Sequence, residues 1–86
     1  MDTKKNSYFE QPEDKVTREE LAAKLKDALE VLTDKEKKVI LLYYYEDLTL
    51  KEISEVMEVS ESRVSQLHTK ALKKMRKIMG NYMEFF

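Results

Sequence analysis

The sequence predicts an all-α fold of four helices, and three observations support this prediction. Glycine and proline occur once each among 86 residues, whereas charged residues make up 38% of the chain. Such a composition is typical of a small helical domain. The helix-capping motif Thr-x-x-Glu occurs three times, and apolar residues recur at intervals of three and four, which is the period of a half-buried helix. The length allows one domain.

The capping motif fixes the starts of three helices. In this motif the Thr hydroxyl accepts a hydrogen bond from the amide three residues later, and the Glu carboxylate reaches back to the Thr amide. It begins at Thr17, Thr33 and Thr49, and Ser60 is an isolated N-cap of the same chemistry. The predicted helices cover about residues 18–31, 34–45, 50–57 and 61–78.

The run VILLYYY, from Val39 to Tyr45, also has the composition of a β-strand. A helix is favoured because the capping motif at Thr33 leads into the run, and no other stretch could pair with a lone strand. An all-apolar helix must contact protein on most sides. Two alternatives therefore remain for Leu41, Tyr44 and Tyr45. The tyrosine rings pack on the domain and leave their hydroxyls in water, or this face contacts a partner.

The last two helices are separated by Glu58, Val59 and Ser60, which is the spacing of a helix-turn-helix with a long recognition helix. Val59 is expected to anchor the turn in the core. Glu58 occupies a position where such turns often have Gly, because the backbone there tends toward positive φ. The residues expected along the buried stripe of the long helix are Val64, Leu67, Ala71, Met75 and Ile78.

The opposite face of the long helix distinguishes this unit from a plain helical hairpin. Between Ser62 and Gly80 there are six basic residues and no acidic one. Short hydrogen-bonding side chains near its start can reach base edges, and basic residues further along can hold phosphates. The candidates for base reading are Ser62, Ser65, Gln66 and Thr69, with Arg63 on the flank. The candidates for the DNA backbone are Lys70, Lys73 and Lys74, with Thr49 and Lys51 at a helix start.

The stretch YYYEDLTLKEISEVMEVSESRVSQLHTKALKKMR, which starts at Tyr43, resembles region 4 of bacterial RNA polymerase sigma factors. It is most similar to the branch that includes the flagellar and motility factors, and the resemblance covers about residues 17–78. The resemblance implies a role in transcription initiation through sequence-specific binding to the minus-35 promoter element. It also implies RNA polymerase core as a partner through the β-subunit flap, possible binding of an anti-sigma factor, and a cytoplasmic protein of the bacterial nucleoid.

The resemblance also maps contacts onto the start of the recognition helix. In primary sigma factors, base and backbone contacts cluster at positions that correspond here to Glu61, Ser62, Ser65 and Gln66. Primary factors usually have arginine where this chain has Glu61 and Ser65. The primary minus-35 sequence is therefore not the expected target, and Glu61 is a backbone candidate only by this mapping.

Several kinds of chemistry are not expected. There is no cysteine, and His68 is the only histidine, so neither a metal site nor a catalytic triad is indicated. A single glycine excludes a Gly-rich phosphate loop. We expect no enzyme and no cofactor, with a structural or phosphate-side role for His68. The longest apolar run has seven residues, too short to span a membrane.

The charge distribution leaves two rival functions open. The net charge is −1, yet residues 46–61 contain six acidic residues and one basic one, next to the basic helix. One rival is a response-regulator output domain with a helix-turn-helix. The other is a protein-interaction module that does not bind DNA alone, which the acidic segment and a pI near 5.9 favour.

Three parts of the chain are expected. Residues 1–16 are polar and read as a flexible arm or linker. Residues 17–79 form the helix-turn-helix domain. Residues 80–86, GNYMEFF, form an apolar tail in which Gly80 has the position of a helix C′ residue. The tail could fold back on the core or contact a partner, and the sequence does not decide between the two.

Overall fold

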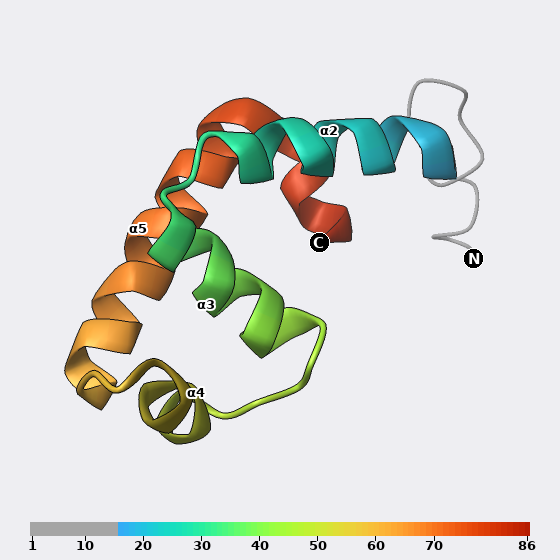
Figure 1. Cartoon of the computed structure of the whole chain (residues 1–86). Coiled ribbons are helices and arrows are strands. Elements are labelled where there is room, and N and C mark those ends of the chain that lie inside the picture. Colours follow the sequence, from blue (N-terminus) through green and yellow to red (C-terminus); the bar gives the residue numbers. More distant parts are fainter. Residues whose placement is uncertain (1–15) are drawn as a thin grey trace, which may run out of the picture.

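Figure 1 shows a computed structural model of the chain, which describes residues 16–86. In this range there are four α-helices and no strand, so the predicted all-α fold is confirmed. The elements are α2 (Arg18–Glu30), α3 (Asp34–Tyr44), α4 (Leu50–Met57), α5 (Glu61–Met79) and the 3-10 helix η2 (Gly80–Phe85). Each predicted helix end agrees with the structure to within one residue. The predicted arm, apart from Val16, lies outside the described residues.

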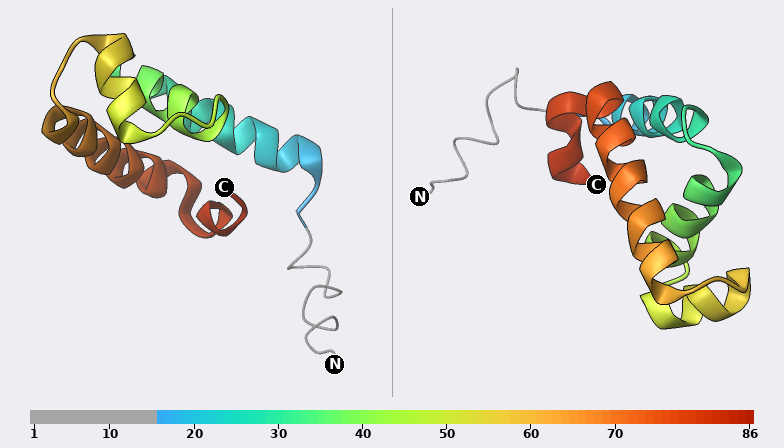
Figure 2. Two further views of the ribbon diagram at one scale, coloured as in Figure 1. Left: turned by 90° about the horizontal axis from the view of Figure 1, so that it is seen from below. Right: turned by 90° about the vertical axis from the view of Figure 1, so that its left-hand side faces the viewer.

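Helix α5 is the element against which all the others pack. α4 contacts its N-terminal part, α3 crosses its middle, and α2 and η2 pack near its C-terminal end. α4 and the start of α5 therefore lie at one end of the molecule, and α2 and η2 lie at the other (Figures 1 and 2). This arrangement leaves one face of α5 without a covering element.

The predicted capping motifs are present at all three positions. In the second, the amide of Glu36 donates to the Thr33 hydroxyl at 3.1 Å, and the amide of Thr33 donates to the Glu36 carboxylate at 3.0 Å. The motifs at Thr17 and Thr49 have the same reciprocal bonds. Ser60 caps α5 by accepting a hydrogen bond from the Arg63 amide. The helix starts are therefore determined by local chemistry.

Two clusters of buried side chains form the core, and α3 and α5 contribute to both. One is centred on α4 and the start of α5, and the other on α2 and the end of α5. The first, the α4–α5 cluster, consists of Val39, Ile53, Val64 and Leu67. The second consists of Ala28, Leu32, Ile40, Ala71, Met75 and Met79. Val39 and Ile40 are adjacent in sequence, so α3 separates the two clusters.

The prediction that Ile78 continues the buried stripe of α5 is wrong. Ile78 is 36% exposed, whereas Met79 is 2% exposed. A step of four residues from Met75 turns the helix by about 40° beyond a full revolution, and a step of three falls about 60° short. Met79 is therefore offset from Met75 by the smaller angle around the helix and stays over the core, whereas Ile78 lies at the edge.

The turn between α4 and α5 has the backbone that the sequence predicts. Glu58 adopts φ 60° and ψ 43°, in the left-handed region, which costs a non-glycine residue about 1–2 kcal/mol. Val59 is half-buried and packs on the α4–α5 cluster, and its amide donates to the Ser54 carbonyl at 3.0 Å. Asp47, which precedes α4, is a second non-glycine residue at positive φ, and the sequence does not reveal it.

A buried ion pair joins α3 to α5. The Glu36 side chain is 3% exposed, and the Lys74 ammonium donates to its carboxylate at 2.8 Å. Burial alone would raise the pKa of Glu36. The hydrogen bonds from Lys74 and from the Thr33 amide outweigh this effect, so the pKa lies below its ordinary value. Glu36 therefore serves two purposes, because it caps α3 and also fixes α3 on α5.

We expect Lys74→Ala to lower the free energy of unfolding by about 1–2 kcal/mol, because it leaves a buried carboxylate without its cation. This figure is at the lower end for a charged hydrogen bond because the Lys74 side chain is 39% exposed and partly screened. Urea unfolding followed by circular dichroism measures the difference. Lys73→Ala, which removes an exposed neighbour, is the matched control.

Acid should remove the difference between Lys74→Ala and its parent. A carboxylate with a lowered folded-state pKa adds stability above the unfolded value of 4.5, and this stability is lost as the pH falls through the folded-state value. The gap between the two proteins should therefore be present at about pH 7 and should shrink as the pH falls below 4.5 and through the folded-state pKa of Glu36. A gap that does not shrink with falling pH would contradict the ion-pair explanation.

Candidate nucleic-acid interface

The exposed face of α5 near its start has a shallow groove lined by polar and basic side chains. The lining residues are Arg63, Ser65, Gln66, Thr69 and Lys70. Their positions oppose Val64 and Leu67, which are buried in the α4–α5 cluster. Four of the five predicted base-reading residues thus line one surface. The fifth, Ser62, is exposed in the first turn of α5 but does not line the groove.

The predicted backbone contacts fall into two groups. Lys51, Lys70 and Lys73 are exposed, so their ammonium groups can reach a phosphate. Lys74 is different because its ammonium is bound to Glu36 on the side of α5 that packs on α3. We therefore remove Lys74 from the phosphate contacts, since binding a phosphate would leave a buried carboxylate unpaired.

For the two other backbone candidates, Thr49 and Glu61, a carboxylate opposes phosphate binding. At the start of α4, the Glu52 carboxylate accepts the Thr49 amide at 2.8 Å, and the Thr49 hydroxyl accepts the Glu52 amide. The capping box thus places a negative charge at this helix start, where it would repel a phosphate. Glu61 is exposed in the first turn of α5. Its negative charge there interacts favourably with the helix dipole but would repel a phosphate.

Acidic and basic residues lie on neighbouring elements of the interface. Glu52, Glu55 and Glu58 are exposed on α4 and its turn, next to the start of α5. The exposed cations Lys70 and Lys73 lie further along α5. The electrostatic potential along α5 therefore becomes more positive from its first turn toward its middle.

His68 lies at the edge of the interface but faces inward. Its Nε2 atom lies 2.9 Å from the Tyr44 hydroxyl, and its ring centre lies 4.9 Å from that of Tyr43. Burial lowers the pKa of His68, and burial together with the neighbouring Tyr43 raises the pKa of Tyr44. The imidazole is therefore neutral at neutral pH and links α5 to α3. This geometry favours a structural role for His68 over a phosphate-side role.

Of the two alternatives left open for the tyrosines of α3, neither describes Tyr44, whose ring packs on the domain but whose hydroxyl is hydrogen-bonded within it. This hydrogen bond joins Tyr44 to His68, and the two residues are 24 positions apart in sequence. Tyr45, at the C-cap of α3, is 56% exposed. The exposed apolar surface of α3 is thus formed by Leu41 and Tyr45.

Two kinds of feature are absent from residues 16–86. No three or more His, Cys, Asp or Glu residues in this range gather as metal ligands would. None of the helices described here combines the length and the apolar character needed to cross a bilayer.

A long helix with a polar start and a basic continuation, joined to α4 by a tight left-handed turn, defines a helix-turn-helix DNA-binding domain. Residues 28–77, more than half of the chain, match the family model described as Sigma-70, region 4. The chain therefore belongs to the sigma-70 region 4 family.

Relatives with curated names agree with this assignment. The RNA polymerase sigma-D factor of Bacillus subtilis is 44% identical over 73 residues, which are 85% of this chain and 29% of the relative. The RNA polymerase sigma factor FliA of Escherichia coli K12 is 52% identical over 60 residues, which are 70% of this chain and 25% of the relative. FliA of Pseudomonas aeruginosa is 47% identical over 64 residues, which are 74% of this chain and 26% of the relative. The predicted similarity to the flagellar branch is confirmed.

The chain spans only between a quarter and three tenths of the length of these relatives. No solved structure matches the chain significantly.

Proposed function

We propose that this chain is the promoter-reading part of an RNA polymerase sigma factor and binds the minus-35 element through α5. The observation that supports this most is the exposed groove of α5, whose lining residues are polar or basic, in a domain of the region 4 family. A role in transcription initiation needs binding but no catalysis, so we propose no enzymatic activity. A cytoplasmic protein associated with the nucleoid follows from the same function.

In this proposal the N-terminal half of α5 enters the major groove. Gln66 is suited to adenine, because its amide can bond N6 and N7 together, and the Thr69 methyl group is suited to thymine. Ser62 and Ser65 can bond either kind of base pair. None of these four side chains favours guanine, so we expect an A/T-rich element with at most one guanine contact, from Arg63.

The remaining contacts would hold the DNA backbone. Lys51, Arg63, Lys70 and Lys73 are exposed and positively charged, whereas the acidic residues of α4 oppose the approach of phosphate. The isolated domain is therefore expected to bind weakly. A larger assembly that positions it on the promoter would compensate, which is consistent with a part of a sigma factor bound to RNA polymerase core.

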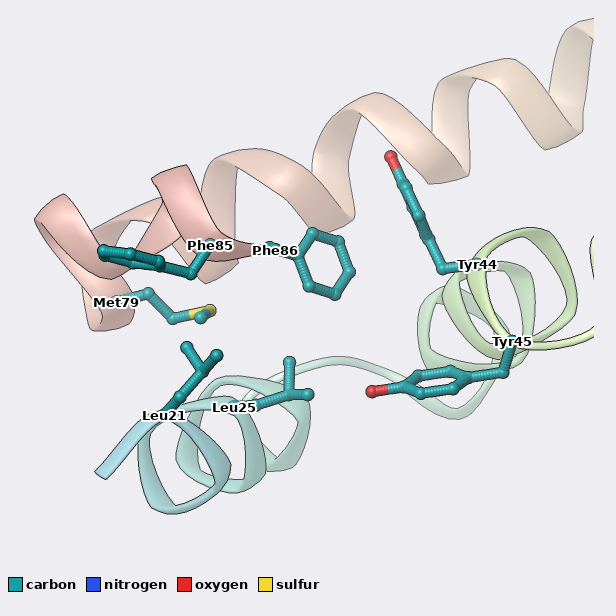
Figure 3. A pocket seen from close by; sticks show the side chains of 7 residues that line it. All are labelled: Leu21, Leu25, Tyr44, Tyr45, Met79, Phe85 and Phe86. Atoms are coloured by element: carbon teal, nitrogen blue, oxygen red, sulfur yellow. The ribbon is translucent and has the colours of Figure 1, made fainter. Parts of the chain in front are cut away.

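A second surface supports the proposal of polymerase binding. An apolar pocket lies between α2, α3 and the end of α5 (Figure 3), toward the opposite end of the domain from the start of α5 (Figure 1). It is lined by Leu21, Leu25, Tyr44, Tyr45, Met79, Phe85 and Phe86. We propose that the β-subunit flap docks here and that an anti-sigma factor could cover the same surface. DNA and polymerase would then occupy opposite ends of the domain.

The test is selection of bound DNA from a random pool with the domain tethered to polymerase. We expect an A/T-rich consensus. For the free domain on the selected site, three or four phosphate contacts predict a slope of log K against log salt of about −3 to −3.5. A pool without consensus, or tight binding with a slope near zero, would refute the proposal.

The acidic residues of α4 favour one rival function, a protein-interaction module that does not bind DNA alone. Pull-down with polymerase combined with gel shift on the selected DNA separates the two. Polymerase binding without any DNA contact by the tethered domain would favour the rival. No observation specifically supports the response-regulator alternative.

A further inference from the structure

Glu61 is the only acidic residue of α5, and the capping chemistry of the other helices does not engage it. In α2, α3 and α4, the acidic residue at the third helical position accepts the N-cap amide. α5 has Arg63 at this position, and the Arg63 amide donates to the Ser60 hydroxyl at 3.0 Å. Glu61 stands two positions earlier, in the first position of the helix. Its carboxylate therefore takes no part in the cap.

The Glu61 carboxylate is also free of other partners within the domain. Its side chain is exposed, and it forms no hydrogen bond or ion pair within the part of the chain that the structure describes. The corresponding carboxylates of Glu20, Glu36 and Glu52 each accept a backbone amide. A charge at a helix start adds stability through the dipole, but this effect needs no particular partner. Glu61 is thus available to an external hydrogen-bond donor.

Glu61 extends the groove-lining face of α5 by one turn. Residues four positions apart are neighbours on a helix surface, so Glu61 lies next to Ser65, which lines the groove together with Gln66. Helical side chains are directed toward the N-terminus of their helix. The first turn of α5 lies at one end of the molecule, beside α4 (Figure 1). Since the N-terminal residues of a recognition helix meet the base edges, Glu61 is placed to approach a base.

A carboxylate distinguishes the bases by the groups that they present in the major groove. Adenine N6 and cytosine N4 are amino donors there, whereas guanine O6 and N7 and thymine O4 are acceptors. An ionised carboxylate can only accept. It therefore bonds an amino group and is repelled by an acceptor and by every phosphate. Such a residue adds little affinity, but specificity is a difference between affinities and can come from rejection of the wrong sequence.

We propose that Glu61 is a specificity residue, which accepts a hydrogen bond from adenine N6 or cytosine N4 at one end of the DNA element and rejects guanine and thymine at that position. This inference rests on the proposed function, because it requires α5 in the major groove. It deepens that function by giving a discriminating role to the one acidic residue of the helix. Glu61 then lowers the affinity for DNA of any sequence and raises the preference for the correct one.

The experiment measures binding of the full chain, tethered to polymerase, to the selected site and to each of its single-base variants. The parent, Glu61→Ala, Glu61→Gln and Glu55→Gln are compared, and thermal melting checks that each is folded. At one base pair the parent should prefer adenine or cytosine by about 5–150-fold, the range of one good base contact. Glu61→Ala should reduce this preference to less than about twofold. It should also bind DNA of unrelated sequence about threefold more tightly, the effect of two unit charges about 7 Å apart in water.

The two glutamine variants identify the base and provide the control. Glutamine bonds adenine through N6 and N7 together, so Glu61→Gln should keep a preference for adenine. A preference for cytosine should fall instead, because the neutral amide accepts less strongly and can also donate to guanine. Glu55→Gln removes an exposed acidic residue of α4, outside the recognition helix. It should leave every base preference unchanged.

The inference is overturned if Glu61→Ala keeps the base preferences of the parent, which is the result expected of a carboxylate that only stabilises the helix start. Promoter reading by the rest of the groove would then still stand. If the parent itself prefers no base at any position, both this inference and the proposed function are wrong.

Discussion

Val64→Asp should abolish the cooperative thermal melting of the domain. Val64 is fully buried between α4 and α5, in a cluster with only three other buried side chains. The substitution places a carboxylate among them without a cation. An uncompensated buried charge costs about 3–5 kcal/mol, whereas a chain of this size has a total stability of about 4–13 kcal/mol. Circular dichroism against temperature measures the loss.

The control for this prediction is the adjacent residue. Ser65→Asp adds the same charge one position along α5, but Ser65 is exposed. Exposed substitutions usually change stability by less than about 0.5 kcal/mol. Ser65→Asp should therefore melt like the parent, although its carboxylate should weaken DNA binding. If Val64→Asp also melts like the parent, the assignment of the core face of α5 is wrong.

Gln66→Ala should change which DNA sequence is preferred as well as how tightly it is bound. Gln66 lies in the exposed groove between Arg63 and Lys70, where a major-groove base edge would be met. Loss of one bidentate contact should cost about 1–3 kcal/mol on the preferred site and relax the choice at one base pair. Binding is measured for each single-base variant of the selected site.

Lys73→Ala is the matched comparison for Gln66→Ala. Lys73 is exposed on the same helix, and a phosphate has no base identity. Lys73→Ala should therefore weaken binding to all variants by a similar factor. If Gln66→Ala also lowers every sequence equally, Gln66 does not read a base and the proposed recognition face is wrong.

Much of the fold was predictable because its determinants are local. Each helix start depends on a Thr or Ser and on residues at most three positions later, so the capping motifs located α2, α3, α4 and α5. The left-handed Glu58 was predictable from the helix-turn-helix template. Asp47 and η2 were not, because no local motif marks them. Ile78 was misplaced because an interval of three or four residues leaves two candidates for each buried position.

The exposed position of the proposed base-reading face was predictable for a geometric reason. Helical periodicity alone places Gln66 and Thr69 opposite Val64. Whether each side chain is free to contact DNA or is already bound within the domain was not predictable. This depends on partners that are distant in sequence. Lys74 looked like any other basic residue of α5, but its partner Glu36 is 38 residues away. The Tyr44–His68 hydrogen bond was hidden for the same reason.

The division of the core at Val39 and Ile40 allows the two ends of the domain to behave differently. α2 and η2 rest on one cluster, and α4 and the start of α5 rest on the other. Clusters with separate members can open as separate cooperative units, with α3 and α5 as the shared frame. Loosening of α2 and η2 by a protein at one end would thus leave the helix-turn-helix intact. Under the proposed function, such a domain would exchange protein partners without releasing the promoter.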